Sequence, residues 1–154
     1  MKEDRTAAVS EFWRSFVEAT GNDGPYASDS FGSNPEMADE LGRLVRDGQK
    51  CATTSLLSEY DEEDEPLPAV GNLSVVLDGR GTPLCVIRTV NVEVRAFGLV
   101  DEAFASVEGE GDRSLAYWRA VHVRFFAGLG KPVDDDTMVV LETFEMLWSP
   151  GLPS

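Results

Sequence analysis

Hydrophobic residues recur at steps of three and four in three long stretches of the chain, which is the spacing of one face of an amphipathic helix. The stretches are residues 6–20, Asn34 to Gly48, and Ser114 to about Ala127. Asparagine, serine and aspartate commonly cap the first turn of a helix, so Asn34 and Ser114 (or Asp112) are predicted N-caps. Gly48 suits a left-handed cap at the end of a helix. A shorter capped helix is expected at residues 101–106. The pattern therefore predicts three long helices and one short helix.

Four other stretches show the alternation or the short apolar runs that are typical of strands. They are residues 52–57, 73–77, 84–97 and 138–148. The second and third are joined by a hairpin turn at residues 78–81. Segments rich in glycine or acidic residues separate these elements and are predicted to be loops, at residues 22–33, 59–65 and 107–113. Helices and strands together indicate an α+β fold.

Two charged residues interrupt the apolar faces of the long strands. Arg88 alternates with Val86 and Val90, and Glu142 alternates with Val140 and Phe144. Because an unpaired buried charge is costly, we expect the two charged groups to pair or to line one pocket. The other interpretation is that a local twist or bulge brings each of them to solvent.

Composition fits one compact domain, since the chain has 154 residues of which 42% are hydrophobic. We divide it into an N-terminal helix and loop at residues 1–30, the main domain at 31–148 and a tail at 149–154, with bounds that follow from the family resemblance given below. Acidic residues outnumber basic ones by 28 to 13, and the formal net charge is −15. The overall field therefore repels nucleic acids and anionic membranes, so that any polyanion has to meet a local cluster of cations.

Several kinds of site are disfavoured by the sequence. Cys51 and Cys85 have neither metal-ligand spacing nor a disulfide pattern, and we expect reduced thiols. The single histidine, His122, excludes a histidine-rich metal site and, beside an apolar stripe, is typical of a hydrogen-bonded core residue. No phosphate loop, dinucleotide fingerprint or serine-nucleophile elbow is present. We therefore predict no metal and no cofactor. The sequence shows neither a signal peptide nor an apolar segment long enough to span a membrane, which predicts a cytoplasmic protein without membrane contact. The sequence does not specify the oligomeric state.

The strongest chemical signal is the stretch from Gly48 to Thr54, in which a helix stop is followed by one lysine and two hydroxyls. Lys50 lies two residues beyond the helix end, and Thr53 and Thr54 enter the next strand. An ammonium there can meet an anion or a carbonyl group, and a threonine hydroxyl can donate a hydrogen bond or attack. The ordinary interpretation of such a stretch is a solvated turn before a strand.

Several motifs together resemble the ASCH family, whose domain is similar to the PUA fold. They cover roughly residues 31–148 and are Gly-Gln-Lys-Cys-Ala-Thr at 48–53, Glu-Pro-Leu-Pro-Ala-Val-Gly at 65–71, Val-Ile-Arg-Thr at 86–89 and Glu-Gly-Glu-Gly-Asp-Arg-Ser-Leu-Ala-Tyr-Trp-Arg at 108–119. The last of these resembles a longer bacterial branch. The resemblance implies a small, mostly closed mixed β-barrel flanked by helices. Cys51 departs from the family pattern, which usually has a basic residue there.

The resemblance also implies a cleft in which Lys50, Thr53, Arg88 and Glu110 converge. In it, Lys50, Thr53 and Glu110 would be catalytic, with Glu110 matched after a shift of one residue. The candidate ligand-binding residues are Arg46, Arg88, Ser114, Tyr117, His122 and Glu142.

The resemblance implies two functions for these residues, and a noncatalytic role is a third. The first is binding of single-stranded RNA or a nucleotide, extended to metal-independent RNA cleavage in which Lys50 or Arg88 supplies a cation and Glu110 or His122 a base. The second is amide hydrolysis on an N4-acetylcytidine-type nucleoside, with Lys50 as base and Thr53 as nucleophile. The third is a noncatalytic module that recognises a nucleotide, RNA, a modified base or a protein partner. The acidic composition opposes the first function more than the second.

Overall fold

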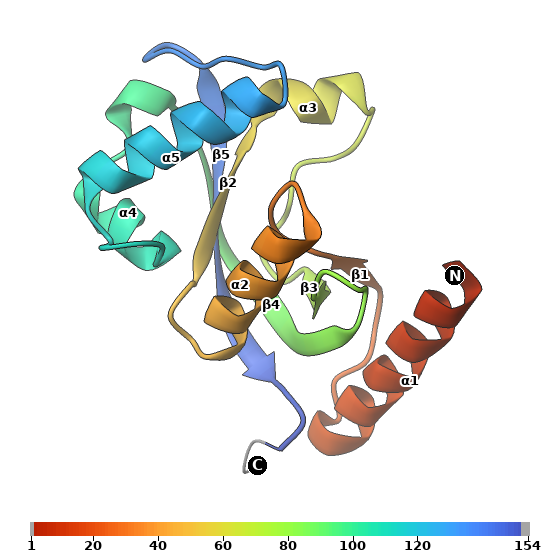
Figure 1. Cartoon of the computed structure of the whole chain (residues 1–154). Helices are drawn as coiled ribbons and strands as arrows, with labels where there is room; N and C mark the ends of the chain where they lie inside the picture. Colours follow the sequence, from red (N-terminus) through yellow and green to blue (C-terminus); the bar gives the residue numbers. More distant parts are fainter. Residues whose placement is uncertain (1, 152–154) are drawn as a thin grey trace. The chain divides into compact units, whose positions relative to one another are not determined.

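The computed structural model describes residues 2–151, with side chains described from residue 7 onward (Figure 1). The helices are α1 (Lys2–Thr20), α2 (Pro35–Arg46), α3 (Leu57–Glu62), the 3-10 helix η1 (Phe97–Leu99), α4 (Glu102–Glu108) and α5 (Leu115–Gly128). The strands are β1 (Tyr26–Asp29), β2 (Ala52–Leu56), β3 (Leu73–Leu77), β4 (Pro83–Ala96) and β5 (Met138–Trp148).

The five strands form one mixed sheet with the order β1-β3-β4-β5-β2. β1 is parallel to β3, whereas β3 and β4, and likewise β2 and β5, run antiparallel. Within residues 2–151 the order ends at β1 on one side and β2 on the other, so the closed barrel implied by the family resemblance is not shown. The prediction of a mixed sheet flanked by helices is confirmed, whereas its closure into a barrel is not shown.

The chain separates into two compact units, and the long strands β4 and β5 contribute to both. The first unit contains the residues up to Gly48, Gly71–Arg88 and the residues from Glu145 onward, and the second contains Gln49–Val70 and Thr89–Phe144. This division differs from a simple N-terminal segment plus domain; the boundaries at residues 30 and 148 remain predictions.

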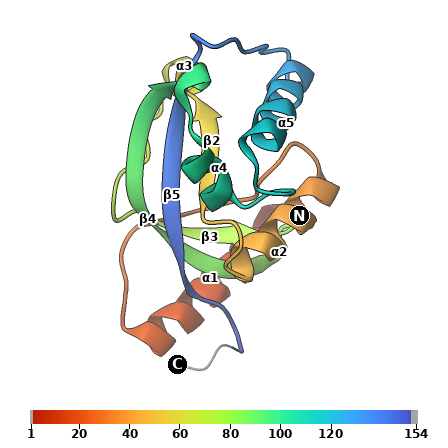
Figure 2. The ribbon, with the colours of Figure 1, turned by 90° about the vertical axis from the view of Figure 1, so that its left-hand side faces the viewer.

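In the first unit, α1 packs its apolar stripe on β3 and the start of β4 (Figure 2). The buried residues of this core are Val9, Trp13, Phe16, Val75 and Val86. The Trp13 ring stacks on Tyr26 of β1 with ring centroids 4.1 Å apart. The predicted amphipathic helix at residues 6–20 is thus a core element of this unit.

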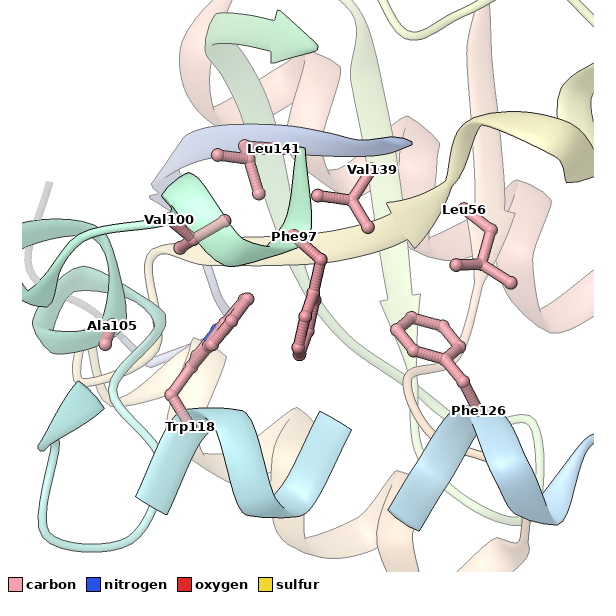
Figure 3. Close-up of a cluster of buried hydrophobic side chains, with 8 residues drawn as sticks. All are labelled: Leu56, Phe97, Val100, Ala105, Trp118, Phe126, Val139 and Leu141. Carbon is pink, nitrogen blue, oxygen red and sulfur yellow. The ribbon is translucent and has the colours of Figure 1, made fainter. Parts of the chain in front are cut away.

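In the second unit, α5 covers the β2 and β5 strands. Trp118 and Phe126 point from α5 toward Leu56, Val139 and Leu141 on the strands (Figure 3). Deeply buried aromatic side chains of this size contribute roughly 3–5 kcal/mol each relative to alanine. α4 lies against both β2 and α5 (Figure 2), so the core holds the C-terminal end of α4 beside β2.

Three predictions about local structure are wrong. Residues 26–29 form β1, although the surrounding polar segment was expected to be a loop. Residues 57–62 form α3 within the expected acidic loop, because exposed acidic side chains are compatible with a surface helix. α4 extends to Glu108 and ends at the left-handed Gly109, two residues beyond its predicted end. Among the helices of residues 2–151, none is both long and apolar enough to span a membrane.

The predicted pairing of Arg88 with Glu142 is also wrong. Arg88 binds Glu145, and both side chains are about half exposed, with exposed fractions of 47% and 45%. Glu142 instead accepts a hydrogen bond from Thr89. The alternation fails around Arg88 because three consecutive residues, 85–87, are all buried where β4 passes out of the first unit. Arg88 reaches solvent and needs no buried partner.

Candidate functional site

Lys50 is the single charged residue in the stretch from Gly48 to Thr54, and it is buried. Its side chain is only 2% exposed, and its Nζ donates hydrogen bonds to the carbonyl oxygen of Ala52 at 2.7 Å and to Glu110 Oε2 at 3.0 Å. Glu110 is more accessible, with 17% of its side chain exposed. A cation and a carboxylate therefore meet within the second unit, and the carboxylate is the partner that solvent or a ligand reaches more easily.

Beside this pair lies Glu108, a fully buried carboxylate at the end of α4. Its Oε1 accepts a hydrogen bond of 2.7 Å from the Thr54 hydroxyl. Its Oε2 forms an ion pair with His122 Nε2 at 2.9 Å. We name these five residues, Lys50, Thr54, Glu108, Glu110 and His122, the Lys50 cluster.

The turn after α4 holds the cluster together. Gly109 has φ +76°, and its carbonyl oxygen accepts a hydrogen bond from Gln49 Nε2 at 3.0 Å. The backbone N–H of Cys51 donates to the carbonyl oxygen of Val107 at 2.9 Å. These contacts join the chain on both sides of Lys50 to both sides of Glu108. The Lys50–Glu110 distance is consequently set by backbone contacts as well as by the ion pair.

His122 is held by α5 in one orientation. Its Nδ1 lies 2.8 Å from the Trp118 carbonyl oxygen, and its ring stacks on the Trp118 ring with centroids 4.4 Å apart. The core position expected for a lone histidine on an apolar stripe is confirmed. Both ring nitrogens have protein partners, so His122 is poorly placed to exchange a proton with a ligand.

Burial and neighbouring charges act in opposite directions on this ion pair. Desolvation raises the pKa of Glu108, but the Lys50 charge and the His122 and Thr54 hydrogen bonds outweigh it, and the pKa is lowered from 4.5. Desolvation lowers the pKa of His122, but the hydrogen bond and charge of Glu108 outweigh it, and the pKa is raised from 6.5. Both shifts favour a Glu108 carboxylate facing a His122 imidazolium.

A pH-dependent contribution to stability follows from these shifts. The Glu108 contribution is present above about pH 4.5 and is lost as the pH falls through the lowered pKa, whereas the His122 contribution is complete below about pH 6.5 and is lost as the pH rises through the raised pKa. We expect His122→Gln to reduce the free energy of unfolding more at about pH 5.5 than at about pH 9. Urea denaturation of both proteins at the two pH values measures this difference. An equal loss at both values would mean that the ion pair does not form.

The cluster also has atoms that are able to coordinate a cation. One ligand atom from each of Glu108, Glu110 and His122 can be chosen so that all three lie within 4.8 Å of one another. However, the Lys50 ammonium already binds Glu110, and the His122 imidazolium balances Glu108. The two carboxylates therefore have two cationic side chains as partners, and any metal would have to compete with Lys50.

The two neighbouring threonines of β2 occupy different surroundings. Thr54 joins the Lys50 cluster. Successive side chains of a strand point to opposite faces, so Thr53 belongs to the other face, where Glu142 of β5 is its cross-strand partner. The structure brings Lys50 and Glu110 together as the family resemblance implies, but the hydroxyl that joins their cluster is that of Thr54.

The remaining predicted site residues have structural roles or lie in the first unit. Ser114 caps α5 by accepting a hydrogen bond from the Tyr117 N–H at 3.1 Å. The Tyr117 ring fills the space beside Gly111, where an added Cβ would lie 2.3 Å from ring carbons. Arg46 lies in the first unit and pairs with Asp47 at 3.5 Å. Their roles toward a ligand remain predictions.

Glu108 and Thr54 are the members of the cluster that sequence reasoning did not select as site residues. A signal for Glu108 exists, because Asp101 and Gly109 suit the two ends of one helix, and Glu108 follows Ala105 by three residues on its buried face. The acidic and glycine-rich composition of the segment instead favoured a loop. For Thr54, the signal is the alternation of the predicted strand, which groups Thr54 with Ala52 and Leu56 and places Thr53 on the other face.

Comparison with known proteins identifies the family. A family model for the ASCH domain matches residues 27–148. The structure is similar to that of protein EF3133 from Enterococcus faecalis V583, with a TM-score of 0.81 and 36% identity over 92% of this chain and 89% of that one. It is also similar to an ASCH domain from Lactobacillus crispatus JV V101, with a TM-score of 0.79 and 32% identity over 95% of each chain.

A more distant structure, the hypothetical protein PH0355, has a TM-score of 0.52 and 16% identity over 79% of this chain and 98% of its own, and shows similarity of fold alone. No curated protein matches the sequence. The family match covers most of the chain, including the Lys50 cluster. The chain belongs to the ASCH domain family.

Proposed function

We propose that this ASCH domain binds single-stranded RNA or a nucleotide at the Lys50 cluster and cleaves RNA there without a metal. The observation that carries the proposal is the contact between Lys50 and Glu110, which places a cation and an accessible carboxylate 3.0 Å apart. Cleavage by the 2′-hydroxyl of RNA needs a base for that hydroxyl and positive charge for the phosphate.

In this reaction Glu110 takes the proton of the 2′-hydroxyl, because it is the more exposed carboxylate of the cluster and both nitrogens of His122 already have partners. The 2′-oxygen forms a bond to phosphorus, and Lys50 stabilises the negative charge that develops. The bond from phosphorus to the 5′-oxygen then breaks, and that oxygen takes a proton from water. The products are a 2′,3′-cyclic phosphate and a 5′-hydroxyl.

A second candidate is hydrolysis of an N4-acetylcytidine-type amide by the same cluster. The net charge of −15 favours it, because an uncharged nucleoside is not repelled by the acidic surface. For this reaction we assign the nucleophile to Thr54 in place of Thr53, because the Thr54 hydroxyl lies in the cluster. A noncatalytic module would use the same residues for binding alone.

One experiment separates these functions. Wild type, Lys50→Ala, Glu110→Gln and Lys131→Ala are incubated in chelator with a labelled single-stranded RNA, its 2′-deoxy analogue and N4-acetylcytidine. We expect RNA scission to fall by about 100-fold or more in Glu110→Gln, the size typical for loss of a general base. Lys131, an exposed lysine paired with Glu62, is the matched control and is expected to behave as wild type.

Each substrate has its own diagnostic outcome. Scission of the 2′-deoxy analogue would contradict attack by the 2′-hydroxyl. Acetate release that is lost in Lys50→Ala and Glu110→Gln would replace the first function with amide hydrolysis. Binding of RNA without turnover, in variants with unchanged circular dichroism, would overturn the catalytic part and leave the binding module.

A further inference from the structure

A second group of polar side chains lies on the face of β2 and β5 opposite Thr54. Glu142 of β5 faces Thr53 of β2 across the strand pair, and Thr89 of β4 donates a hydrogen bond to Glu142 Oε2 at 2.6 Å. Thr89 is 3% exposed, whereas Thr53 and Glu142 are half-buried. The Glu142 carboxylate is thus held by a hydrogen bond from the buried Thr89 hydroxyl and is still partly exposed to solvent.

Glu142 has unused capacity to accept hydrogen bonds. Among the side chains of residues 7–151 it forms no ion pair with a lysine or arginine, and Thr89 is its one side-chain donor. A carboxylate offers about four acceptor positions on its two oxygens. A half-buried carboxylate without a cation is costly for a fold, which a ligand that supplies N–H donors would offset.

Tyr60 is an aromatic residue on the same side of β2 as Glu142. The Tyr60 hydroxyl and the Ser55 hydroxyl are 2.7 Å apart, which fixes the ring of Tyr60 at the end of β2. Ser55 lies two residues after Thr53 on the same face of β2, which places the Tyr60 hydroxyl on the side of the strand that Glu142 shares. Burial raises the pKa of Tyr60, and the charge of Glu142 adds to that increase. A ring beside a hydrogen-bonding carboxylate is a combination by which proteins recognise unstacked bases.

We propose that Glu142, supported by Thr89 and accompanied by Tyr60, recognises a guanine base. Guanine presents two parallel donors, its ring N1–H and its exocyclic amine, which match the two oxygens of one carboxylate. Adenine and cytosine each offer an exocyclic amine without an adjacent ring N–H, and uracil offers a single ring N–H. This inference rests on the proposed binding of RNA or a nucleotide and assigns the selected base to a separate subsite, on the face of β2 opposite Thr54 and the Lys50 cluster.

The test compares binding of guanosine, inosine and adenosine 5′-monophosphates by isothermal titration calorimetry. Inosine differs from guanosine by the exocyclic amine alone. We expect wild type to bind the guanosine nucleotide about tenfold more tightly than the other two, the size of one bidentate base contact. Glu142→Gln keeps the side-chain shape and an acceptor for Thr89, and is expected to remove this preference.

Glu145→Gln is the matched control, because it removes the same charge three residues further along β5 from an exposed position. It is expected to retain the preference for guanosine. Equal affinities of wild type for all three nucleotides, or an unchanged preference in Glu142→Gln, would overturn the inference alone. Absence of binding for every nucleotide and for single-stranded RNA would overturn the proposed function as well.

Discussion

Replacing Glu108 with alanine is expected to reduce the free energy of unfolding by about 3–5 kcal/mol, the range for removing one partner of a buried ion pair. The stability is lost because the groups that contact or surround the carboxylate remain buried without it. Without the carboxylate, the His122 imidazole loses its ion-pair partner and the Thr54 hydroxyl loses its acceptor. The nearby Lys50 ammonium loses one of the negative charges that surround it.

Urea denaturation followed by circular dichroism measures this loss. Glu18→Ala removes an exposed glutamate from α1 and is expected to change stability by less than about 0.5 kcal/mol. Glu108→Gln keeps the acceptor for Thr54 but not the charge, so its stability is expected to lie between wild type and Glu108→Ala. A loss in Glu108→Ala no larger than in Glu18→Ala would show that the cluster does not hold a buried charge pair.

Local signals predicted the helix ends well, since the groups involved are close in sequence. Asn34 caps α2 by accepting a hydrogen bond from the Met37 N–H at 2.8 Å, and Gly48 has φ +82°, as expected for a left-handed residue after a helix. Ser114 likewise caps α5. Each feature depends on three or four neighbouring residues, which a sequence displays directly.

Side-chain partners across the sheet were not predictable in the same way. Period-2 alternation grouped Arg88 with the apolar face of β4, but a run of buried residues breaks the period just before it. The choice of Glu145 over Glu142 depends on how β4 meets β5, and a residue pattern within one strand contains no such information. β1 was missed because its parallel partner β3 lies more than 40 residues away, and its own four residues are mostly exposed.

The candidate site was predicted in part. The resemblance selected Lys50 and Glu110, which are 60 residues apart in sequence and form an ion pair. It did not select Glu108, whose burial depends on the packing of α4 against β2. The two glutamates differ in accessibility, and that difference separates a group able to meet a ligand from one that organises the cluster.

Replacing Gly109 with alanine is the prediction that tests how the cluster is assembled. Gly109 has φ +76°, and an added Cβ would lie 2.1 Å from the carbonyl oxygen of Gln49 and 3.0 Å from the Cα of Lys50. A left-handed alanine costs roughly 1–2 kcal/mol, and forcing a methyl group into packed backbone costs roughly 1–3 kcal/mol. We expect a total loss of about 2–5 kcal/mol in the free energy of unfolding.

Gly128→Ala provides the matched control, because Gly128 is the last residue of α5 and an added Cβ there would meet no atom within 4 Å. Alanine is favoured over glycine in helices by up to about 1 kcal/mol, so this variant is expected to be as stable as wild type or slightly more stable. Denaturation midpoints compare the two variants. In Gly109→Ala the turn has to move away from Gln49, which separates Glu110 from Lys50, so RNA scission is expected to fall as well. Wild-type stability in Gly109→Ala would show that the turn after α4 is not packed against the segment containing Lys50.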